Sequence, residues 1–266
     1  MHLRTGQTLW RTTFTISVLS LLLFIAGFLL ALNPFLLRSG QGMAPSAGSK
    51  PVAPSAPLPE QGKLTVVALG DSLTRGAGDA SGLGYVGLVR EALEKQRHQS
   101  LILHNLAING QQSSGLLAQL EQPQIRRLVA DADLIVFTIG GNDLFQQSGG
   151  VYQLDEKKLD AAMNSLTTNF GKILSQLREL NGKAPILYTA LYNPFGDTEA
   201  AQETAAPVLA WNGKAAEIAS RVPGVMVVPT YDLFVQKENK YLYTDHFHPN
   251  HAGYQRIADR IMQALE

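Results

Sequence analysis

The stretch LTVVALGDSLTRG, residues 64–76, begins as an apolar run, stops at a glycine and continues at once with polar residues. Four later runs have the same apolar character, each closed near its end by glycine, asparagine or proline: residues 101–107, 133–140, 185–192 and 225–230. Nearly continuous apolar runs indicate strands that are buried on both faces, as in a parallel sheet covered by helices. We therefore predict an α/β fold with a five-stranded parallel sheet.

The segments between these runs carry the periodicity of amphipathic helices. Residues 159–177 have an apolar stripe at helical spacing, and residues 254–265 have another. Each stripe predicts a helix that packs one face on the core. Because ligands of open parallel sheets bind beyond the carboxyl ends of the strands, the residues that follow each apolar run are candidates for a functional site.

The first 62 residues differ in composition from the rest of the chain. No charged residue lies between Arg11 and Arg38, and this run exceeds the roughly 20 apolar residues that cross a bilayer. We predict a short cytoplasmic tail and a transmembrane helix within residues 1–38, a linker rich in Pro, Ala, Ser and Gly over 39–62, and a folded domain over 63–266. Arg4 and Arg11 favour a cytoplasmic N-terminus. A cleaved secretory signal is the alternative, and either segment would place the domain outside the cytoplasm.

The overall composition excludes several classes of function. The chain has 22 Lys and Arg against 22 Asp and Glu, so no charge excess favours binding to nucleic acid. It has no cysteine, which removes disulfides, thiolate metal ligands and thiol catalysis. Any nucleophile must be an oxygen or a nitrogen.

Ser72 directly follows the first predicted strand, at a glycine-flanked turn. Such a turn exposes a side chain at the edge of the sheet, as a nucleophilic serine requires. Serine is also a preferred helix N-cap, so a purely structural role is the alternative. The G-x-S-x-G elbow of another large hydrolase class is absent, because residue 74 is threonine.

The stretch TDHFHPNHAGY, residues 244–254, holds three histidines and an aspartate. Asp245 and His248 are spaced so that the carboxylate can reach one ring nitrogen while the other faces a serine. A metal site made of Asp245, His246, His248 and His251 is an alternative, although the spacing matches no common zinc framework. A solvated loop without a role is a third.

Two further turns could supply donors to an oxyanion. Asn142, in GGND after the third run, offers a side-chain N–H, and Gly110, after the second run, offers a backbone N–H. The amide of Ser72 would be a third donor. Both motifs are also common in ordinary turns.

These four blocks together resemble the GDSL or SGNH hydrolase family in order and spacing, over about residues 64–264. The resemblance implies a flavodoxin-like three-layer α/β/α sandwich and ester or thioester hydrolysis without a metal or other cofactor. It implies that Ser72 is the nucleophile, that His248 is the base oriented by Asp245, and that Gly110 and Asn142 complete the oxyanion hole. Gln111 departs from the small polar residue or aspartate that many members carry after the glycine. His246 and His251 receive no role.

Two loops after the third and fourth runs carry aromatic residues that could form an acyl groove: Phe145, Tyr152, Tyr192 and Phe195. Each could instead anchor its loop to the core. We expect a membrane-tethered esterase that acts on acyl esters, with lysophospholipid or a similar lipid as the leading substrate. The alternatives are an O-acetylesterase or acyltransferase of envelope polysaccharide, and a non-catalytic envelope-binding module.

Overall fold

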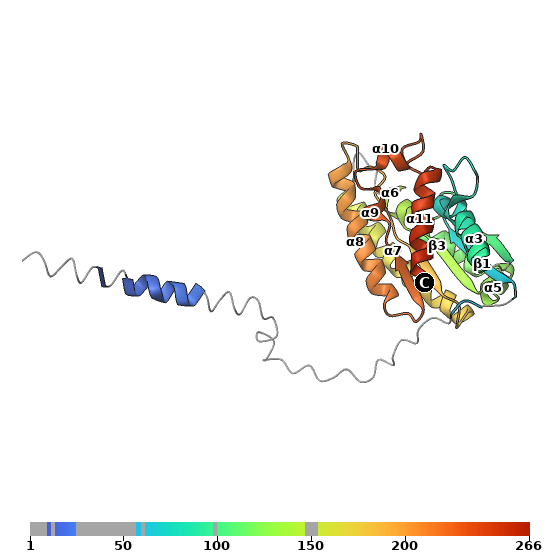
Figure 1. The fold of residues 1–266 in the computed structure, drawn as a ribbon, viewed down its shortest axis with the longest axis horizontal. Coiled ribbons are helices and arrows are strands. Elements are labelled where there is room, and N and C mark those ends of the chain that lie inside the picture. The colour runs from blue at the N-terminus through green and yellow to red at the C-terminus, as the bar shows by residue number, and fades with distance from the viewer. Residues whose placement is uncertain (1–9, 12–13, 25–56, 60–61, 98–99, 147–153) are drawn as a thin grey trace, which may run out of the picture. The chain divides into compact units, whose positions relative to one another are not determined.

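The computed structural model describes residues 10–11, 14–24, 57–59, 62–97, 100–146 and 154–266. The chain divides into two compact units, residues 1–50 and 51–266. All of the sheet lies in the second unit (Figure 1).

The second unit is built on a parallel sheet of five strands in the order β2-β1-β3-β4-β5. The strands are β1 (Leu64–Gly70), β2 (Leu101–Asn105), β3 (Leu134–Thr138), β4 (Ile186–Thr189) and β5 (Val225–Val228). The predicted five-stranded parallel sheet is therefore confirmed. Four of the strands end before the predicted runs do, because the chain turns out of the sheet there and supplies loops at its carboxyl edge.

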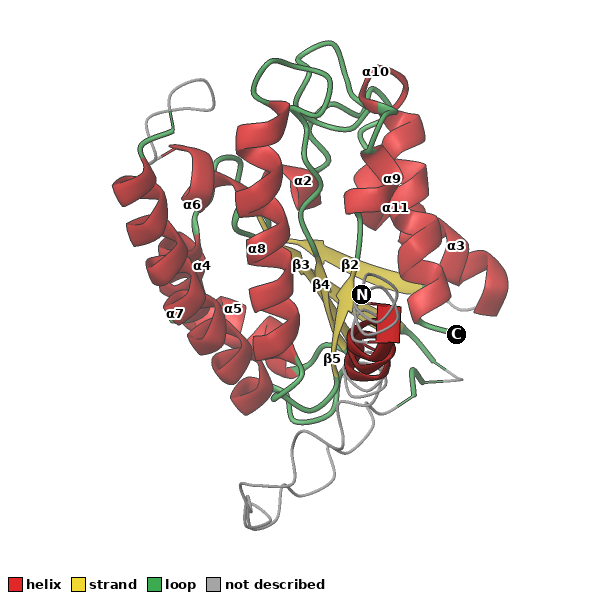
Figure 2. Cartoon of the chain, turned by 90° about the vertical axis from the view of Figure 1, so that its left-hand side faces the viewer, coloured by secondary structure: helices red, strands yellow, loops and turns green. Residues whose placement is uncertain are grey.

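Helices cover both faces of the sheet (Figure 2). One face packs against α4 (Ser113–Leu120), α5 (Pro123–Ala130), α7 (Glu156–Leu180) and α8 (Ala201–Ala219). The other face packs against α3 (Gly84–Arg97), α9 (Tyr231–Phe234) and α11 (His251–Ala264). Three short helices lie near the carboxyl edge: α2 (Ser72–Arg75), α6 (Gly141–Gln146) and α10 (Glu238–Tyr241).

Alternation along the strands divides the core into two layers. In β1, Val67 and Leu69 face one helix layer, while Val66 and Ala68 face the other. This follows from the two-residue period of a strand, and it explains why the run is apolar throughout. The predicted helix over 159–177 is the middle of α7, which begins after the N-cap Asp155.

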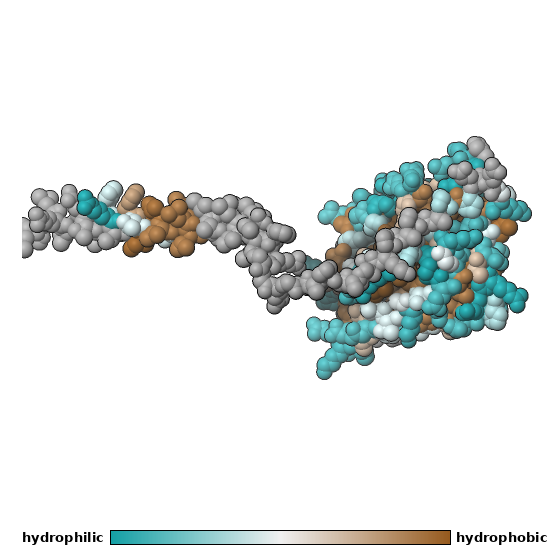
Figure 3. Space-filling view, turned by 90° about the horizontal axis from the view of Figure 1, so that it is seen from below, coloured by the Kyte–Doolittle hydropathy of each residue, from teal (hydrophilic) through white to brown (hydrophobic). Residues whose placement is uncertain are grey.

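The first unit contains helical residues at 10–11 and 14–24. Their large apolar side chains are exposed, and Figure 3 marks the described part of this segment as mainly hydrophobic. Within the described parts of the chain, no helix is long and apolar enough to cross a membrane. The rest of the predicted span lies outside the described residues. In the predicted linker, Leu58 is buried in the core layer formed with α3 and α11.

Candidate active site

Ser72 is presented by a tight turn at the end of β1. Gly70 has φ +109°, and a Cβ at this position would lie 1.9 Å from the carbonyl oxygen of Thr138. Only glycine allows β1 and β3 to approach this closely. Asp71 is the N-cap of α2, and its Oδ1 accepts from the amide of Leu73 at 3.1 Å. The capping role considered for Ser72 is therefore filled by Asp71.

A network of buried side chains holds this turn against the core. Thr138 Oγ1 donates to Asp71 Oδ1 at 2.7 Å and lies 2.8 Å from Thr74 Oγ1. Thr74 Oγ1 is in turn 2.6 Å from Tyr85 Oη. Burial raises the pKa of Asp71 above its usual value, against the opposing effect of the bond from Thr138. These bonds fix the turn that carries Ser72 to β3, through Thr138, and to α3, through Tyr85.

His248 joins Ser72 and Asp245. Its Nε2 lies 2.8 Å from Ser72 Oγ, and its Nδ1 lies 2.7 Å from Asp245 Oδ2. Because a carboxylate only accepts, Nδ1 carries the proton and Nε2 is free to accept from the serine. Burial raises the pKa of Asp245, but hydrogen bonds led by that from His248 outweigh burial and hold it below the usual value.

The loop that carries His248 is shaped by local hydrogen bonds. Asp245 Oδ1 accepts from the amides of Phe247 and His248, each at 3.0 Å. This turn requires a left-handed backbone at His246, with φ +52°. Tyr192 Oη donates to the carbonyl of Phe247 at 2.6 Å. His246 therefore shapes the turn through its backbone, and Tyr192 supports the loop from the core.

Gly110 and Asn142, the two predicted oxyanion donors, line the same pocket as Ser72 and His248. Gly110 has φ +73°. Asn142 Nδ2 donates to the carbonyl of Gln111 at 3.0 Å, and Asn142 Oδ1 accepts from Gln146 Nε2 at 2.8 Å. Hydrogen bonds to both the oxygen and the nitrogen thus orient the side-chain amide of Asn142, and its second N–H can point toward an oxyanion.

Gln111 and Asp143 secure the elements on either side of this pair. Gln111 Nε2 donates to Gln119 in α4 at 3.0 Å, so the residue that departs from the family pattern is tied to the following helix. Asp143 accepts from the amide and the hydroxyl of Ser113, which fastens α6 to the start of α4. Burial raises the pKa of Asp143 despite these bonds.

The pocket beside Ser72 has a volume of about 360 Å³. Of the aromatic residues predicted to bind substrate, Phe145 and Phe195 line it. Tyr192 is not among the residues that line it: its ring is buried and stacks on Phe234 at 4.1 Å, as expected for a residue that anchors its loop to the core, and its contact with substrate stays a prediction. Tyr152 lies outside the described residues.

The three histidines of residues 244–254 do not converge on one point. His248 bonds to Asp245 and Ser72, whereas His251 Nδ1 lies 3.2 Å from Asp79. In the part of the chain that the structure describes, no group of three or more His, Asp or Glu side chains is placed to hold a metal ion.

Residues 68–256 match the GDSL-like lipase/acylhydrolase family. This chain belongs to that family. The uncharacterized protein YpmR of Bacillus subtilis is 36% identical over 208 residues, which cover 76% of this chain and 82% of YpmR. The spore germination lipase LipC of Bacillus licheniformis is 32% identical over 210 residues, 76% of this chain and 96% of LipC. A crystal structure of the lipase Lip_vut3 from a goat rumen metagenome is 31% identical, with a TM-score of 0.69 over 76% of this chain and all of that one.

This GDSL-like hydrolase also has pocket residues that the sequence analysis missed. They are Ala77, Asn109, Gly141, Gln146 and Phe247. Phe247 stands between Asp245 and His248, so its position in the motif could have indicated it. Asn109 and Gly141 adjoin predicted oxyanion residues in the same way. Gln146 and Ala77 carry no comparable signal: Gln146 is the last residue of the short helix α6, and Ala77 lies in the turn after α2.

Proposed function

We propose that this chain is a serine esterase that cleaves carboxylic esters or thioesters through an acyl-enzyme on Ser72. The observation that carries the proposal is the continuous chain from Asp245 through His248 to Ser72 Oγ, with bonds of 2.7 and 2.8 Å. A neutral imidazole with an unprotonated Nε2 beside a serine hydroxyl is the arrangement that general-base activation requires.

In the first half of the reaction, His248 Nε2 takes the proton of Ser72 as Oγ attacks the ester carbonyl. As the bond from Oγ to carbon forms, the π electron pair of the carbonyl moves to its oxygen, and the resulting oxyanion accepts from the amides of Ser72 and Gly110 and from Asn142 Nδ2. Asp245 stabilises the imidazolium that forms. The tetrahedral intermediate then collapses, the bond to the leaving alcohol or thiol breaks, and His248 returns its proton to that leaving group.

In the second half, water replaces the leaving group. His248 takes a proton from the water as its oxygen attacks the acyl-serine, and the oxyanion forms in the same place. Collapse releases the carboxylic acid and returns the proton to Ser72 Oγ. Both halves use the same residues in the same roles, because the second is the first in reverse with water as the alcohol.

We further propose that the acyl group is a fatty chain and that lysophospholipid or a similar lipid is the substrate. Three aromatic side chains in the pocket support this: Phe145, Phe195 and Phe247. Phe195 packs between the other two, with ring centroids 5.8 and 5.9 Å apart. The pocket falls within the roughly 300–1,000 Å³ range of sites that bury small ligands. LipC and Lip_vut3, each above 30% identity, are lipases by name.

The N-terminal segment would act as an anchor that keeps the domain at the outer face of the cell membrane. Its support is the uncharged run between Arg11 and Arg38 and the exposed apolar side chains of residues 14–24. Secretion after cleavage of the segment is the alternative. Fractionation of cells, with an antibody to the folded domain, distinguishes membrane-bound from released protein.

The substrate is tested with the full chain in detergent, beside Ser72→Ala as the matched control. Fatty acid released from lysophospholipid and acetate released from acetylated xylan are measured in parallel. Release of fatty acid by the wild type and not by Ser72→Ala is expected. Release of acetate alone would contradict the lipid proposal and indicate an acetylated polysaccharide as the substrate. Equal rates for the wild type and Ser72→Ala would remove Ser72 from the mechanism.

A further inference from the structure

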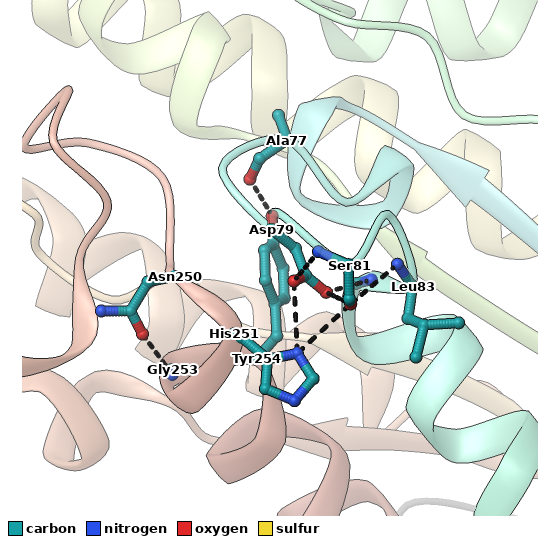
Figure 4. A network of polar contacts seen from close by, with 9 residues as sticks. Ala77, Asp79, Ser81, Leu83, Asn250, His251, Gly253 and Tyr254 are labelled. Carbon is teal, nitrogen blue, oxygen red and sulfur yellow. Dashed lines mark hydrogen bonds and ion pairs between the residues drawn. The ribbon is translucent and has the colours of Figure 1, made fainter.

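The segment between α2 and α3, residues 76–83, is organised around the buried carboxylate of Asp79. Its side chain is 0% exposed and accepts from the Ser81 amide at 2.9 Å, the Ser81 hydroxyl at 2.8 Å and the Gly84 amide at 2.8 Å (Figure 4). A fourth donor, His251 Nδ1, comes from α11 at 3.2 Å. A carboxylate bound by several N–H and O–H groups holds them together strongly. Asp79 therefore links this segment to a distant part of the chain.

The same segment contacts both members of the Ser72–His248 pair. The Ser72 carbonyl accepts from the amides of Gly76 and Ala77 at 3.1 and 3.0 Å. Gly78 lies directly against the loop of the base: a Cβ at Gly78 would be 2.8 Å from the Cβ of His248 and 2.7 Å from the Pro249 carbonyl. Because there is no room for even a Cβ between Gly78 and the loop that carries His248, the position of the segment limits how His248 can approach Ser72.

His251 is the first residue of α11 and lies three residues after His248. Its Nδ1 is the donor to Asp79, because a carboxylate can only accept, and it lies 3.3 Å from Ser81 Oγ. One turn later, Tyr254 Oη donates to the Ala77 carbonyl at 2.7 Å (Figure 4). The start of α11 is thus fastened to the segment at two points.

We propose that His251 and Asp79 are positioning residues that hold His248 at hydrogen-bonding distance from Ser72. The inference rests on the proposed function of Ser72 and His248. The contacts form a closed ring, from Ser72 through residues 76–79 to His251, and back along the chain through His248 to Ser72. The bond between His251 and Asp79 joins two segments that are 172 residues apart. Loss of the His251 side chain removes its contacts with both Asp79 and Ser81, and among the described residues it leaves the bond from Tyr254 Oη to the Ala77 carbonyl to hold α11 to the segment.

The effect should fall on the chemical step. His251 is 53% exposed and does not line the pocket, so its loss leaves the groups that bind substrate in place. Transfer of the serine proton depends steeply on the distance between Ser72 Oγ and His248 Nε2. A misplacement of about 1 Å can cost roughly 10²-fold in rate, so a partial loosening is expected to lower kcat by about tenfold.

The chain allows a matched pair of substitutions at His251. Asparagine places its Nδ2 at the same number of bonds from the backbone as histidine Nδ1 and keeps an N–H donor there. Leucine has a methyl group at that position and no donor. The control is Gln255→Leu, one turn later in α11: Gln255 is exposed, and its side chain donates within the helix to Asp259 at 2.8 Å. We measure kcat and KM on a p-nitrophenyl ester, the rate at which a fluorophosphonate labels Ser72, and the Tm, all with the full chain in detergent.

His251→Leu is expected to lower kcat and the labelling rate about tenfold with KM changed less than about twofold, and His251→Asn to restore most of both. Gln255→Leu should match the wild type. If folded His251→Leu matches the wild type, or if His251→Asn is as slow as His251→Leu at equal Tm, the positioning role is wrong. If the wild type is not labelled and Ser72→Ala is equally active, the proposed function fails and the positioning role fails with it.

Discussion

Replacing Gln146 with leucine should slow catalysis by disturbing the orientation of Asn142. Gln146 Nε2 donates to Asn142 Oδ1 at 2.8 Å, and Asn142 Nδ2 donates to the Gln111 carbonyl at 3.0 Å. A primary amide has two N–H groups, so one remains for the oxyanion. Leucine removes the donor that keeps Oδ1 turned away from the reacting carbonyl.

Two comparisons limit how far kcat should fall in Gln146→Leu. Complete loss of the donor, as in Asn142→Ala, is expected to cost about 10²–10³ in kcat. Gln146 contributes one neutral hydrogen bond at an exposed position, worth about 0.5–1.5 kcal/mol. The bond to Gln111 still restrains the amide, so we expect kcat to fall about three- to tenfold, within the limit set by that one bond. Gln146→Glu should cost more, because a carboxylate facing Oδ1 favours the flipped amide.

The assay is a double-mutant cycle with Gln146→Leu, Asn142→Ala and the combined variant, measured as kcat on a p-nitrophenyl ester. If Gln146 acts through Asn142, the combined variant should be no slower than Asn142→Ala alone. Losses that multiply would show that Gln146 acts on the substrate independently, since it also lines the pocket. That outcome would refute the reasoning.

Three other predictions test the supports of the site. Gly70→Ala should cost about 3 kcal/mol or more of unfolding free energy in urea, because its Cβ would meet the Thr138 carbonyl at 1.9 Å; a stable variant would contradict the proposed closeness of β1 and β3. Tyr192→Phe should cost about 1 kcal/mol and lower kcat, because it removes the bond to the Phe247 carbonyl; unchanged kcat would show that the loop needs no such support. Burial raises the pKa of Asp79, but hydrogen bonds, led by those from Ser81, outweigh burial and hold this pKa below 3.8. The ionised carboxylate therefore stabilises the fold above pH 3.8, and this stabilisation is lost as the pH falls through the pKa of the folded state. The stability difference between wild type and Asp79→Asn should therefore shrink as the pH falls below 3.8, and a difference that widens there would reverse the assigned sign.

The sheet was predictable because its strands are short apolar runs that end at turn residues. That prediction also brings Ser72, Gly110 and Asn142 near one another, since each follows a strand and parallel strands end at the same edge. The direction of side chains beyond the strands was not predictable. Tyr192 lies three residues after the end of β4, where no two-residue alternation applies, and its ring turns into the core. Gln146 is placed by a helix of six residues, which sequence periodicity cannot resolve.

The two halves of the Ser72–His248 pair are held by different kinds of interaction. The serine turn is built into the core, where Asp71, Thr74 and Thr138 are all at most 2% exposed. His248 sits on a loop that is fastened mainly by separate hydrogen bonds, such as those from Tyr192 and to Asp245. Each of these bonds is worth about 0.5–3 kcal/mol, so losing one leaves the domain folded while it shifts the base. Changes beneath Ser72 should therefore appear mainly as lost stability, and changes around His248 mainly as lost kcat.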